Sequence, residues 1–329
     1  MKKALIIHSP LEDDAPPDEL DVLQQVELFR KGLQALGYSV GVVPFPYDIK
    51  HLEVIVRDVN PDFIVNLVET LFADGRLVHT GPFLFDHFKL PYTGSSGHAI
   101  YLTSHKILSK EYMRMYGVKT PEFYTYDMIS ENENLTFKRP FLVKSLWEHA
   151  SYGLDENTQL LFHTGQELLE RMRKEKNPGD FFCEEYIHGR EFNLSLLAGP
   201  DGPEVLPPAE IRFHFPPEKA RILGYKAKWE EDSFEYKNTV RTFHFNKQDE
   251  PLISKLKEIS LQCWKIYGLR GYARVDFRVD EKGNIYVLEI NANPCISPDS
   301  GFVAAAHQSG IYSREIVKRI VEDIKYKNR

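Results

Sequence analysis

The apolar and polar positions in the N-terminal part of the chain predict a parallel α/β unit. Three apolar runs have the length of buried strands: residues 4–8, 38–43 and 63–67. Between the first two, residues 20–36 carry apolar side chains at helical spacing, and Gly37 follows as a natural C-terminal cap. A strand, a helix and a second strand in this order are typical of parallel sheets with helical crossovers. We expect the unit to extend to about residue 95, and it lacks the GxGxxG turn of dinucleotide-binding sites.

Beyond that unit the pattern predicts mixed helices and strands. The segment Gly94-Ser95-Ser96-Gly97 marks a boundary. Helices are predicted at residues 104–116, 167–174, 252–266 and 314–324, and strands at 141–146, 181–187 and within 203–215. Residues 216–245 are charged and aromatic with poor periodicity. We interpret them as a long excursion over a site, because loops of that length inside a compact domain are usually functional.

The segment 272–293, YARVDFRVDEKGNIYVLEINAN, predicts two strands joined by a short turn. On the first strand charged side chains alternate with apolar ones, the period of a half-buried strand. On the second strand one face is expected to hold Ile285, Val287, Glu289 and Asn291. If residues 281–284 form a four-residue loop, Asp280 pairs with Ile285 and the register of the hairpin follows.

This register places two carboxylates opposite each other. Asp276 faces Glu289, and one step further Arg274 faces Asn291. Directly opposed like charges destabilise a sheet, so we interpret the two acids and the neighbouring amide as a cradle for a divalent cation. Carboxylate and amide oxygens suit Mg²⁺, which keeps its other positions for water and substrate phosphates. A hairpin with a solvated acidic face is the alternative interpretation.

Composition narrows the class of protein. At 329 residues the chain can form two or three domains, and its net charge of −7 argues against binding to nucleic-acid backbones. The three cysteines are scattered without metal-ligand spacing, which fits a reducing compartment. The N-terminal apolar run is too short for a signal peptide, and no stretch approaches the roughly 20 apolar residues of a membrane span. We therefore expect a cytoplasmic protein without membrane or nucleic-acid partners.

Two further segments could contact a nucleotide. Lys144 ends a short strand and precedes a loop with serine and glycine, where ammonium and backbone N–H groups can bind phosphate. The acids Glu184, Glu185 and Glu191 end an apolar strand or follow a glycine turn, where a backbone can read adenine and a carboxylate can accept from ribose. A solvated acidic loop explains these acids equally well. Taken alone, Lys144 and Lys106 match ordinary solvated lysines.

Taken together, these segments resemble the ATP-grasp superfamily and, within it, the D-alanine–D-alanine ligase family. The resemblance runs over nearly the whole chain and is strongest at residues 90–119, 141–153, 184–195 (EEYIHGREFNLS) and 271–300. It implies an α/β ATP-grasp fold with a Rossmann-like domain at 1–95, a central subdomain at 96–187 and a C-terminal subdomain with the metal site at 188–329. Ligases of this family phosphorylate an amino-acid carboxylate with ATP, and a second amine then attacks the acyl phosphate.

The resemblance implies roles for individual residues. By this resemblance, Lys106, Lys144 and Ser151 contact the nucleotide phosphates. Glu184 and the backbone of Glu185, Tyr186 and Ile187 form the adenine-binding hinge. Glu191 is the acid that binds the ribose. The metal ligands are Asp276, Glu289 and Asn291, in agreement with the hairpin register. The resemblance implies that Arg274 stabilises the phosphoryl group during transfer and that Lys228 of the mobile loop assists. It implies that Ser300 holds the carboxylate of the second substrate. ATP, Mg²⁺ (or Mn²⁺), small amino-acid-like substrates and a homodimer are implied.

The departures from the family concentrate in the amino-acid half of the site. The phosphate loop reads His149-Ala150-Ser151 in place of Gly-Ser-Ser, and Trp229 replaces a tyrosine that normally bonds the first serine and a glutamate. We find no clear counterpart for that glutamate. The third strand runs into Glu69-Thr70 in place of His-Gly, and Pro294-Cys295 replaces Pro-Gly. Asp299 adds an acid next to Ser300. Cys295 lacks a recognisable histidine partner, which favours an incidental thiol over a nucleophile.

Three functional hypotheses follow. The first is an ATP-dependent carboxylate–amine ligase with a specificity other than D-alanyl-D-alanine, of which a small-carboxylate kinase is a variant. The second is a true D-alanine–D-alanine ligase, in which Ala150 and Trp229 do not face the substrate. The third is a catalytically silent ATP-binding protein, against which the complete set of metal ligands and lysines argues.

Overall fold

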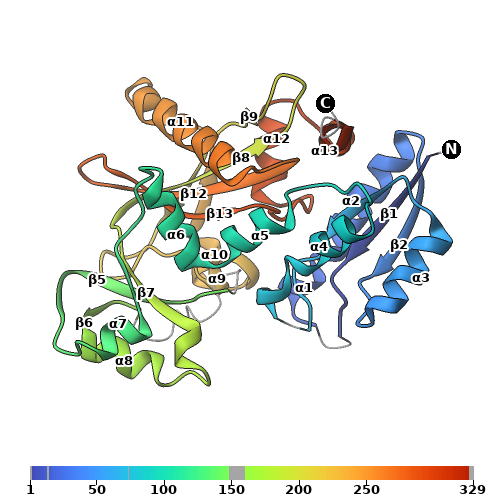
Figure 1. Ribbon diagram of the computed structural model, residues 1–329. Coiled ribbons are helices and arrows are strands. Elements are labelled where there is room, and N and C mark those ends of the chain that lie inside the picture. The colour runs from blue at the N-terminus through green and yellow to red at the C-terminus, as the bar shows by residue number, and fades with distance from the viewer. Residues whose placement is uncertain (1, 13–14, 73, 148–159, 326–329) are drawn as a thin grey trace.

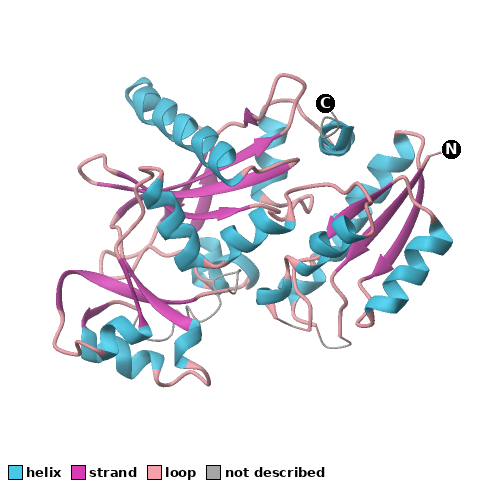
Figure 2. Ribbon diagram, in the orientation of Figure 1, coloured by secondary structure: helices cyan, strands magenta, loops and turns pink. Residues whose placement is uncertain are grey.

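The computed structural model describes residues 2–12, 15–72, 74–147 and 160–325, and in these residues the strands form three sheets (Figures 1 and 2). The first sheet is parallel, in the order β2 (Ser39–Pro44), β1 (Lys3–His8) and β3 (Phe63–Leu67). Its helices are α1 (Pro17–Leu20), α2 (Val22–Ala35), α3 (Ile49–Val59) and α4 (Thr80–His87). The predicted N-terminal α/β unit is therefore confirmed.

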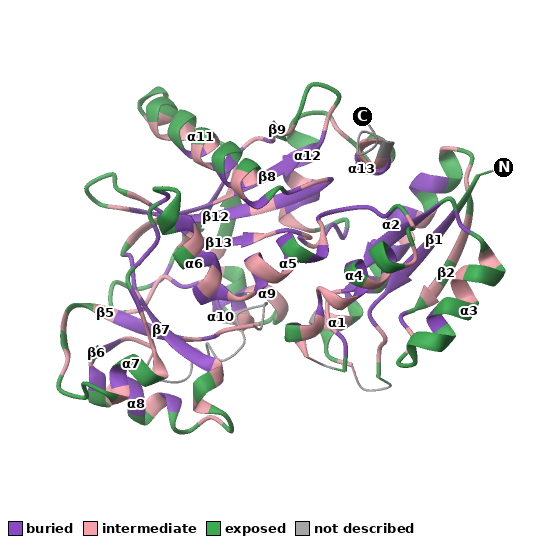
Figure 3. Ribbon diagram, in the orientation of Figure 1, coloured by how far each residue is buried: buried purple, intermediate pink, exposed green. Residues whose placement is uncertain are grey.

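Strand β1 is buried on both faces, which explains its uninterrupted apolar run (Figure 3). Ala4 and Ile6 pack in one core cluster with α2, whereas Leu5 and Ile7 pack in another on the side of α3 and α4. Helix α13 (Ser313–Lys325) closes the first cluster by packing against α2. A Cβ at Gly32 of α2 would lie 2.7 Å from Cγ2 of Val317, so this close approach of the two helices requires glycine.

The second sheet is antiparallel, in the order β4 (Phe123–Thr125), β7 (Phe181–Glu185), β5 (Thr136–Ser145) and β6 (Phe162–Thr164). Helices α7 (Tyr126–Ser130) and α8 (Gly165–Met172) pack against it. The chain reaches this sheet through α5 (Gly97–Ser104) and α6 (Lys106–Met115); α6 is the helix predicted at 104–116, whereas α5 was not predicted. The helices break at His105, whose extended backbone lets its ring accept from the Leu108 N–H and cap α6.

The third sheet is antiparallel and carries the candidate metal residues. Its order is β11 (Thr239–Thr242), β10 (Ala209–Phe213), β8 (Gly189–Leu197), β12 (Tyr272–Asp280) and β13 (Ile285–Asn291), and β9 (Glu204–Val205) pairs with β8. The apolar side chains of β12 pack against α11 (Glu250–Tyr267), so the charged ones face the other way. Helix α12 (Gly301–Gln308) follows the hairpin. No described helix is long and apolar enough to cross a bilayer.

Residues 216–245 are more regular than their sequence pattern indicated. They contain α9 (Tyr225–Trp229), α10 (Phe234–Lys237) and the edge strand β11. Helices of four or five residues span little more than one turn, so they show no hydrophobic period to detect. The predicted excursion therefore contains short elements of its own, which the sequence pattern did not indicate.

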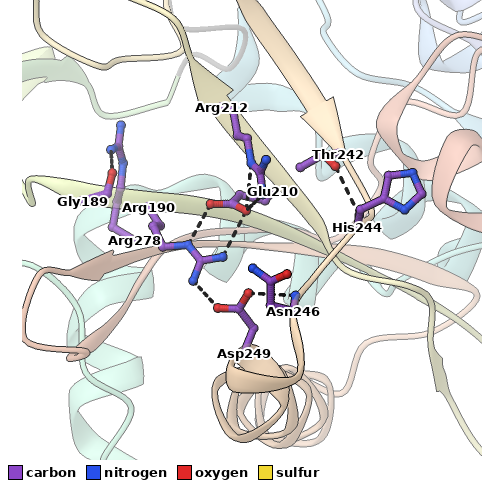
Figure 4. Close-up of polar contacts among 9 residues, drawn as sticks. All are labelled: Gly189, Arg190, Glu210, Arg212, Thr242, His244, Asn246, Asp249 and Arg278. Carbon is purple, nitrogen blue, oxygen red and sulfur yellow. Dashed lines mark hydrogen bonds and ion pairs between the residues drawn. The ribbon is translucent and has the colours of Figure 1, made fainter.

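A polar network ties β8 and β10 of the third sheet to the start of α11 (Figure 4). Arg190 of β8 donates from Nε to Glu210 Oε1 at 2.7 Å and from Nη1 to Asp249 Oδ1 at 2.6 Å, just before α11 begins. Glu210 of β10 also accepts from Arg212 Nε at 3.3 Å. All these groups lie on the α11 side of the sheet, so the network is a structural clamp.

Replacing Glu210 tests that clamp. Glu210→Gln removes the charge between Arg190 and Arg212, and we expect it to lower the free energy of unfolding by about 1–2 kcal/mol. Urea denaturation measures this loss. Glu204→Gln, which removes a half-exposed partner of Arg319, is the matched control and is expected to cost under about 0.5 kcal/mol. Equal losses in both variants would contradict a structural role for the Glu210 clamp.

Candidate functional site

The hairpin of β12 and β13 has the predicted register where it matters for a metal. Arg274 is paired with Asn291 and Asp276 with Glu289. The turn end of the hairpin differs, because Val279 and not Asp280 pairs with Ile285. Asp280 belongs to the turn instead, where its Oδ1 accepts from the backbone N–H groups of Lys282 and Asn284 at 3.0 and 2.8 Å.

A β-bulge in β13 restores the predicted pairing at Asp276 and Glu289. Phe277 pairs with Val287 while Asp276 pairs with Glu289, so Leu288 is the extra residue of β13. Its carbonyl accepts from Nζ of Lys110 at 3.1 Å. The bulge also puts Val287 in the apolar cluster under α11, so the expectation that Val287 and Glu289 share one face was wrong.

Asp276 is buried and gathers hydrogen-bond donors from three positions of the sheet. It accepts at 2.8 Å from both Nε and Nη2 of Arg274, at 2.7 Å from Nδ2 of Asn193 on β8, and at 3.1 Å from Nδ2 of Asn291. These contacts hold the candidate metal carboxylate in one orientation. They also place the Arg274 guanidinium directly beside it.

The oxygen donors of this cluster fit a hard divalent cation. Asp276, Glu289 and Asn291 present two carboxylates and an amide from adjacent strands. Within the described part of the chain no three histidine, cysteine or carboxylate side chains gather as a metal site. A site with two carboxylates and one amide leaves positions for water and phosphate oxygens, which is the arrangement that Mg²⁺ commonly takes.

Glu184 lies in a buried charge cluster that bridges the second and third sheets. It is 1% exposed, its Oε1 accepts from Lys144 Nζ at 2.6 Å, and it forms a second ion pair with Lys110. Burial alone would raise the pKa of Glu184, but the two ammonium groups outweigh it and hold the pKa below its usual value. Lys110 also donates to Thr120 Oγ1 at 2.9 Å. Sequence reasoning missed Lys110, which looks like any other lysine in an amphipathic helix.

The predicted hinge begins with the last two residues of β7, Glu184 and Glu185, and continues through Tyr186 and Ile187. The backbone N–H groups of Glu185 and Tyr186 donate to Glu122 and Pro140 at 2.8 Å, so these two N–H groups serve the protein itself. Tyr186 packs with Leu142 and with Ile222 from the segment between β10 and α9. The second sheet, the hinge and that segment therefore meet in one small apolar cluster. Ile187 of the hinge and Lys106, the first residue of α6, are also buried.

Glu191 lies on the same face of the third sheet as the metal candidates. It sits opposite Arg278 in the β8–β12 pairing, and the two side chains form an ion pair of 2.9 Å. Burial raises the pKa of Glu191, although Arg278 opposes this shift. The carboxylate is thus fixed in place but not strongly acidic, which suits an acceptor for hydroxyl groups.

Helix α9 brings Lys228 to the acids from the opposite side. Burial lowers the pKa of Lys228, the Glu289 carboxylate opposes this shift, and Arg274 adds to it. Asp276 and Glu191 are further neighbours whose charge acts on the same ammonium. The indole Nε1 of the adjacent Trp229 is buried and has no hydrogen-bond partner among the described residues.

A second polar cluster joins the N-terminal sheet to the segment after β13. Cys295 Sγ donates to Asp21 Oδ2 at 2.8 Å and lies 3.0 Å from Ser297 Oγ, which itself donates to Asp299 Oδ1 at 2.9 Å. Gln25 of α2 donates to Glu69 Oε1 at 2.8 Å. Burial, and next the charge of Asp21, raise the pKa of Cys295 well above its usual range, so the group is a thiol and not a nucleophilic thiolate.

The comparisons with known proteins agree with this arrangement. A family model described as the D-ala D-ala ligase C-terminus matches residues 111–322, well over half of the chain. The chain belongs to the D-alanine–D-alanine ligase family. An uncharacterised protein of Sinorhizobium fredii is 34% identical over 79% of this chain and 73% of its own length. The D-alanine–D-alanine ligase of Aquifex aeolicus is 29% identical over 88% of this chain and 91% of its own length.

Solved structures show the same fold. The D-alanine–D-alanine ligase of Bacillus anthracis, in its complex with ATP, superposes with a TM-score of 0.73 at 20% identity, and the match covers 99% of this chain and 98% of that one. A synthetase of Vibrio cholerae gives a TM-score of 0.75 at 15% identity. The fold is therefore ATP-grasp, as the sequence resemblance implied. Family membership makes the chain an ATP-dependent, amide-forming ligase.

Within this D-alanine–D-alanine ligase family fold, most of the predicted residues come together. One face of the third sheet and its surroundings bring together Lys144, Glu184, Glu191, Lys228, Arg274, Asp276, Glu289 and Asn291. Ser300 lies apart at the start of α12 and caps it by accepting from the Val303 N–H at 3.2 Å. His149, Ala150 and Ser151 lie outside the described residues.

Sequence reasoning missed Asp21 and Gln25, and only Gln25 leaves a signal in the sequence. Gln25 is 1% exposed on the otherwise apolar face of α2 that also buries Val22 and Val26. A polar residue on that face needs a partner, and the Ile296 N–H and Glu69 supply it. Asp21 lies at the start of the same helix and is buried. Its approach to Cys295 joins residues from opposite ends of the chain, so no local pattern could reveal it.

The lowered pKa of Lys228 predicts the alkaline limb of the rate profile. If Lys228 acts as a cation, activity falls as the pH rises through its pKa, and this fall comes at a lower pH than for an ordinary lysine. Lys228→Arg keeps the charge at high pH, so we expect its alkaline limb to move upward even if its rate is lower. The measurement is kcat/KM for ATP between about pH 7 and 10.5. Lys226→Arg on the same helix is the control, and an unmoved limb in Lys228→Arg would contradict this role.

Proposed function

We propose that this enzyme joins two amino acids through an acyl phosphate, uses ATP and Mg²⁺, and has a specificity other than D-alanyl-D-alanine. The observation that carries the proposal is the meeting of Asp276, Glu289 and Asn291 on one hairpin, with Arg274 and Lys228 brought to the same carboxylates. Two acids, an amide and two cations of this kind match the needs of phosphoryl transfer to a carboxylate.

The nucleotide would lie between the second and third sheets. The hinge and the apolar side chains of Tyr186, Leu142 and Ile222 would contact the adenine, and Glu191 would accept from the ribose. Lys144, with Lys106 from the start of α6, would contact the phosphates. The buried acid Glu184 keeps Lys144 charged, because its carboxylate outweighs burial and raises the pKa of that lysine.

The transfer step must overcome repulsion between a carboxylate and the γ-phosphate. Asp276, Glu289 and Asn291 would hold the Mg²⁺, which, when bound, neutralises phosphate charge. Arg274 is already oriented by Asp276, so its remaining guanidinium N–H can donate to the phosphoryl oxygens. Lys228 would add charge from α9. The segment that carries α9 and α10 also covers the site, which would protect an acyl phosphate from water.

The second polar cluster supports a changed specificity. Asp21 lies where α2 begins and bonds Cys295, at the position where the family has a glycine. The Cys295 thiol is bulkier than a glycine, and it donates a hydrogen bond to one carboxylate oxygen of Asp21. Glu69, which with Thr70 stands in place of the family's His-Gly, adds a further polar side chain and accepts from Gln25 of α2. Together with Trp229, these residues indicate an amino-acid pocket whose shape and hydrogen bonds differ from those of a D-alanine site.

The test is ADP release from ATP and Mg²⁺ across L- and D-amino acids, singly and in pairs, with mass spectrometry of the products. We expect turnover that requires a particular pair, and its loss in Glu289→Gln. Turnover with D-alanine alone would refute the changed specificity and leave a true D-alanine–D-alanine ligase. ADP release that needs an acid but no amine would indicate a kinase. Tight ATP binding without turnover on any pair would refute the ligase and favour a silent ATP-binding protein.

A further inference from the structure

The cover segment, residues 214–238 between β10 and β11, is fastened to the proposed nucleotide site at Arg221. The backbone N–H of Arg221 donates to the hydroxyl of Tyr186 in the hinge at 3.1 Å, and its backbone carbonyl accepts from Nη2 of Arg278 on β12. Both polar groups of this residue's backbone are therefore held by side chains of the site. The next residue, Ile222, is buried in one apolar cluster with Tyr186.

Arg278 reaches the cover segment from the face of the third sheet that carries the metal candidates. It is 4% exposed, lies opposite Glu191 in the β8–β12 pairing, and forms the ion pair of 2.9 Å with it. Its Nη1 donates to the backbone carbonyl of Gly189 at 3.2 Å (Figure 4). Its Cζ also lies 5.7 and 5.6 Å from the ring centroids of Tyr186 and Phe213. These contacts fix the guanidinium, so the donor that it offers to the cover segment is fixed as well.

The same contacts connect the cover segment with the nucleotide. In the proposed function the adenine lies against Tyr186 and Ile222 while the ribose donates to Glu191. The nucleotide would then contact Tyr186 directly and Arg278 through its ion-pair partner. Coupling between binding events is reciprocal, so a fastened segment that favours ATP is itself favoured by ATP. The segment also carries Lys228, whose ammonium lies near the carboxylates of the proposed metal site.

We propose that Arg278 is a positioning residue that fastens the cover segment over the nucleotide, and thereby holds Lys228 at the transfer site and keeps water out. This inference rests on the proposed ligase function. Arg278 acts through the backbone of Arg221 and not on the reacting groups. A segment released from Arg278 would let water attack the acyl phosphate, which returns the free carboxylate and phosphate, so ATP is consumed without an amide.

The experiment measures ADP and amide together in the wild type, Arg278→Gln and Arg278→Lys. ATP and Mg²⁺ are saturating, and the substrates are the pair found in the amino-acid panel. We expect one ADP for each amide in the wild type. Arg278→Gln should form amide about 100-fold more slowly, because Lys228 is misplaced, and should release several ADP for each amide. Arg278→Lys keeps the charge beside Glu191 and a donor for the carbonyl, so it should recover part of the coupling.

Tyr186→Phe tests the fastening from the other side. It removes the acceptor of the Arg221 N–H but leaves no buried charge unpaired, so it serves even if Arg278→Gln fails to fold. We expect it to release excess ADP as well, although less than Arg278→Gln does. Both substitutions act on the backbone of one residue, so their effects should be less than additive in the double variant.

Trypsin cleavage of the cover segment, after Arg221 or Lys226, provides a measurement without turnover. The β,γ-imido analogue of ATP, with Mg²⁺ and at about ten times its Kd, should slow this cleavage about tenfold in the wild type. In Arg278→Gln the analogue should give little protection even when it is saturating. Arg212→Gln, which removes a charge from β10 on the clamped face, is the control and should keep both the protection and one ADP for each amide.

The outcomes separate the two proposals. Folded Arg278→Gln and Tyr186→Phe variants that keep the wild-type coupling and protection would refute the role of Arg278, as would a wild type that the bound analogue does not protect. If the wild type binds the analogue but forms neither ADP nor amide with any substrate pair, the proposed function fails. The trypsin comparison then decides the role of Arg278 by itself.

Discussion

Asp276→Asn is expected to lower kcat by about 1,000-fold, because it removes a carboxylate of the proposed metal site and frees the Arg274 guanidinium that the carboxylate orients. Steady-state ADP release is the measurement, over a wide range of Mg²⁺ concentrations. Excess Mg²⁺ should recover only part of the rate, since the guanidinium stays misplaced. Binding of ATP to the hinge should weaken far less than the rate.

Asp280→Asn is the matched control for this prediction. It changes an acid on the same strand, four residues away, that serves the turn by accepting from Lys282 and Asn284. We expect its rate to stay within about twofold of the wild type. Asp276 is buried, so thermal unfolding must show that Asp276→Asn is folded. A folded Asp276→Asn with a rate within about tenfold of the wild type would contradict the assignment of Asp276 to the metal site.

Glu184→Gln is expected to lower the free energy of unfolding by about 3–5 kcal/mol, because it leaves Lys110 and Lys144 buried without their counter-ion. Urea denaturation at neutral pH measures the loss. Glu185→Gln is the control, since Glu185 pairs with the half-exposed Arg139 and should cost under about 1 kcal/mol. Adding Lys110→Met to Glu184→Gln should recover part of the loss by removing one of the two stranded charges.

The stability difference between the wild type and Glu184→Gln should depend on pH in a definite direction. The folded pKa of Glu184 is held below its unfolded value, so its stabilisation is present above the unfolded pKa and is lost as the pH falls through the folded one. The difference between the wild type and Glu184→Gln should therefore shrink in acid. A loss under about 1 kcal/mol that does not change with pH would mean that the two lysines do not depend on Glu184.

The pairing of Asp276 with Glu289 was predicted correctly because two one-residue errors in the predicted register cancel. Asp280 was placed in the ladder, but its carboxylate binds the turn backbone, which pulls it out of the pairing with Ile285. The bulge at Leu288 then adds one residue to β13 and brings Asp276 back opposite Glu289. Alternation alone could not reveal the bulge, because its stabilising contact comes from Lys110, far away in the sequence.

The amino-acid half of the site was less predictable for a physical reason. Buried strands such as β1 and β12 can be recognised from sequence, because the apolar pattern that burial requires lies within a few consecutive residues. The contact of Cys295 with Asp21 joins segments that are distant in the sequence. The short helices α9 and α10 bring Lys228 to the acids, but they are too short to show a helical period in the sequence. The family resemblance supplied the role of Lys228, whereas the contacts of Asp21 and Gln25 required the fold.

The most direct test of an acyl-phosphate ligase follows an oxygen atom. The acyl donor is labelled with ¹⁸O in its carboxylate and incubated with ATP, Mg²⁺ and the acceptor, and the released phosphate is analysed by mass spectrometry. When the carboxylate attacks the γ-phosphate and the amine then displaces phosphate, one carboxylate oxygen leaves with the phosphorus. We expect one ¹⁸O atom in the phosphate for each amide formed. Amide formation with unlabelled phosphate would contradict the proposed mechanism.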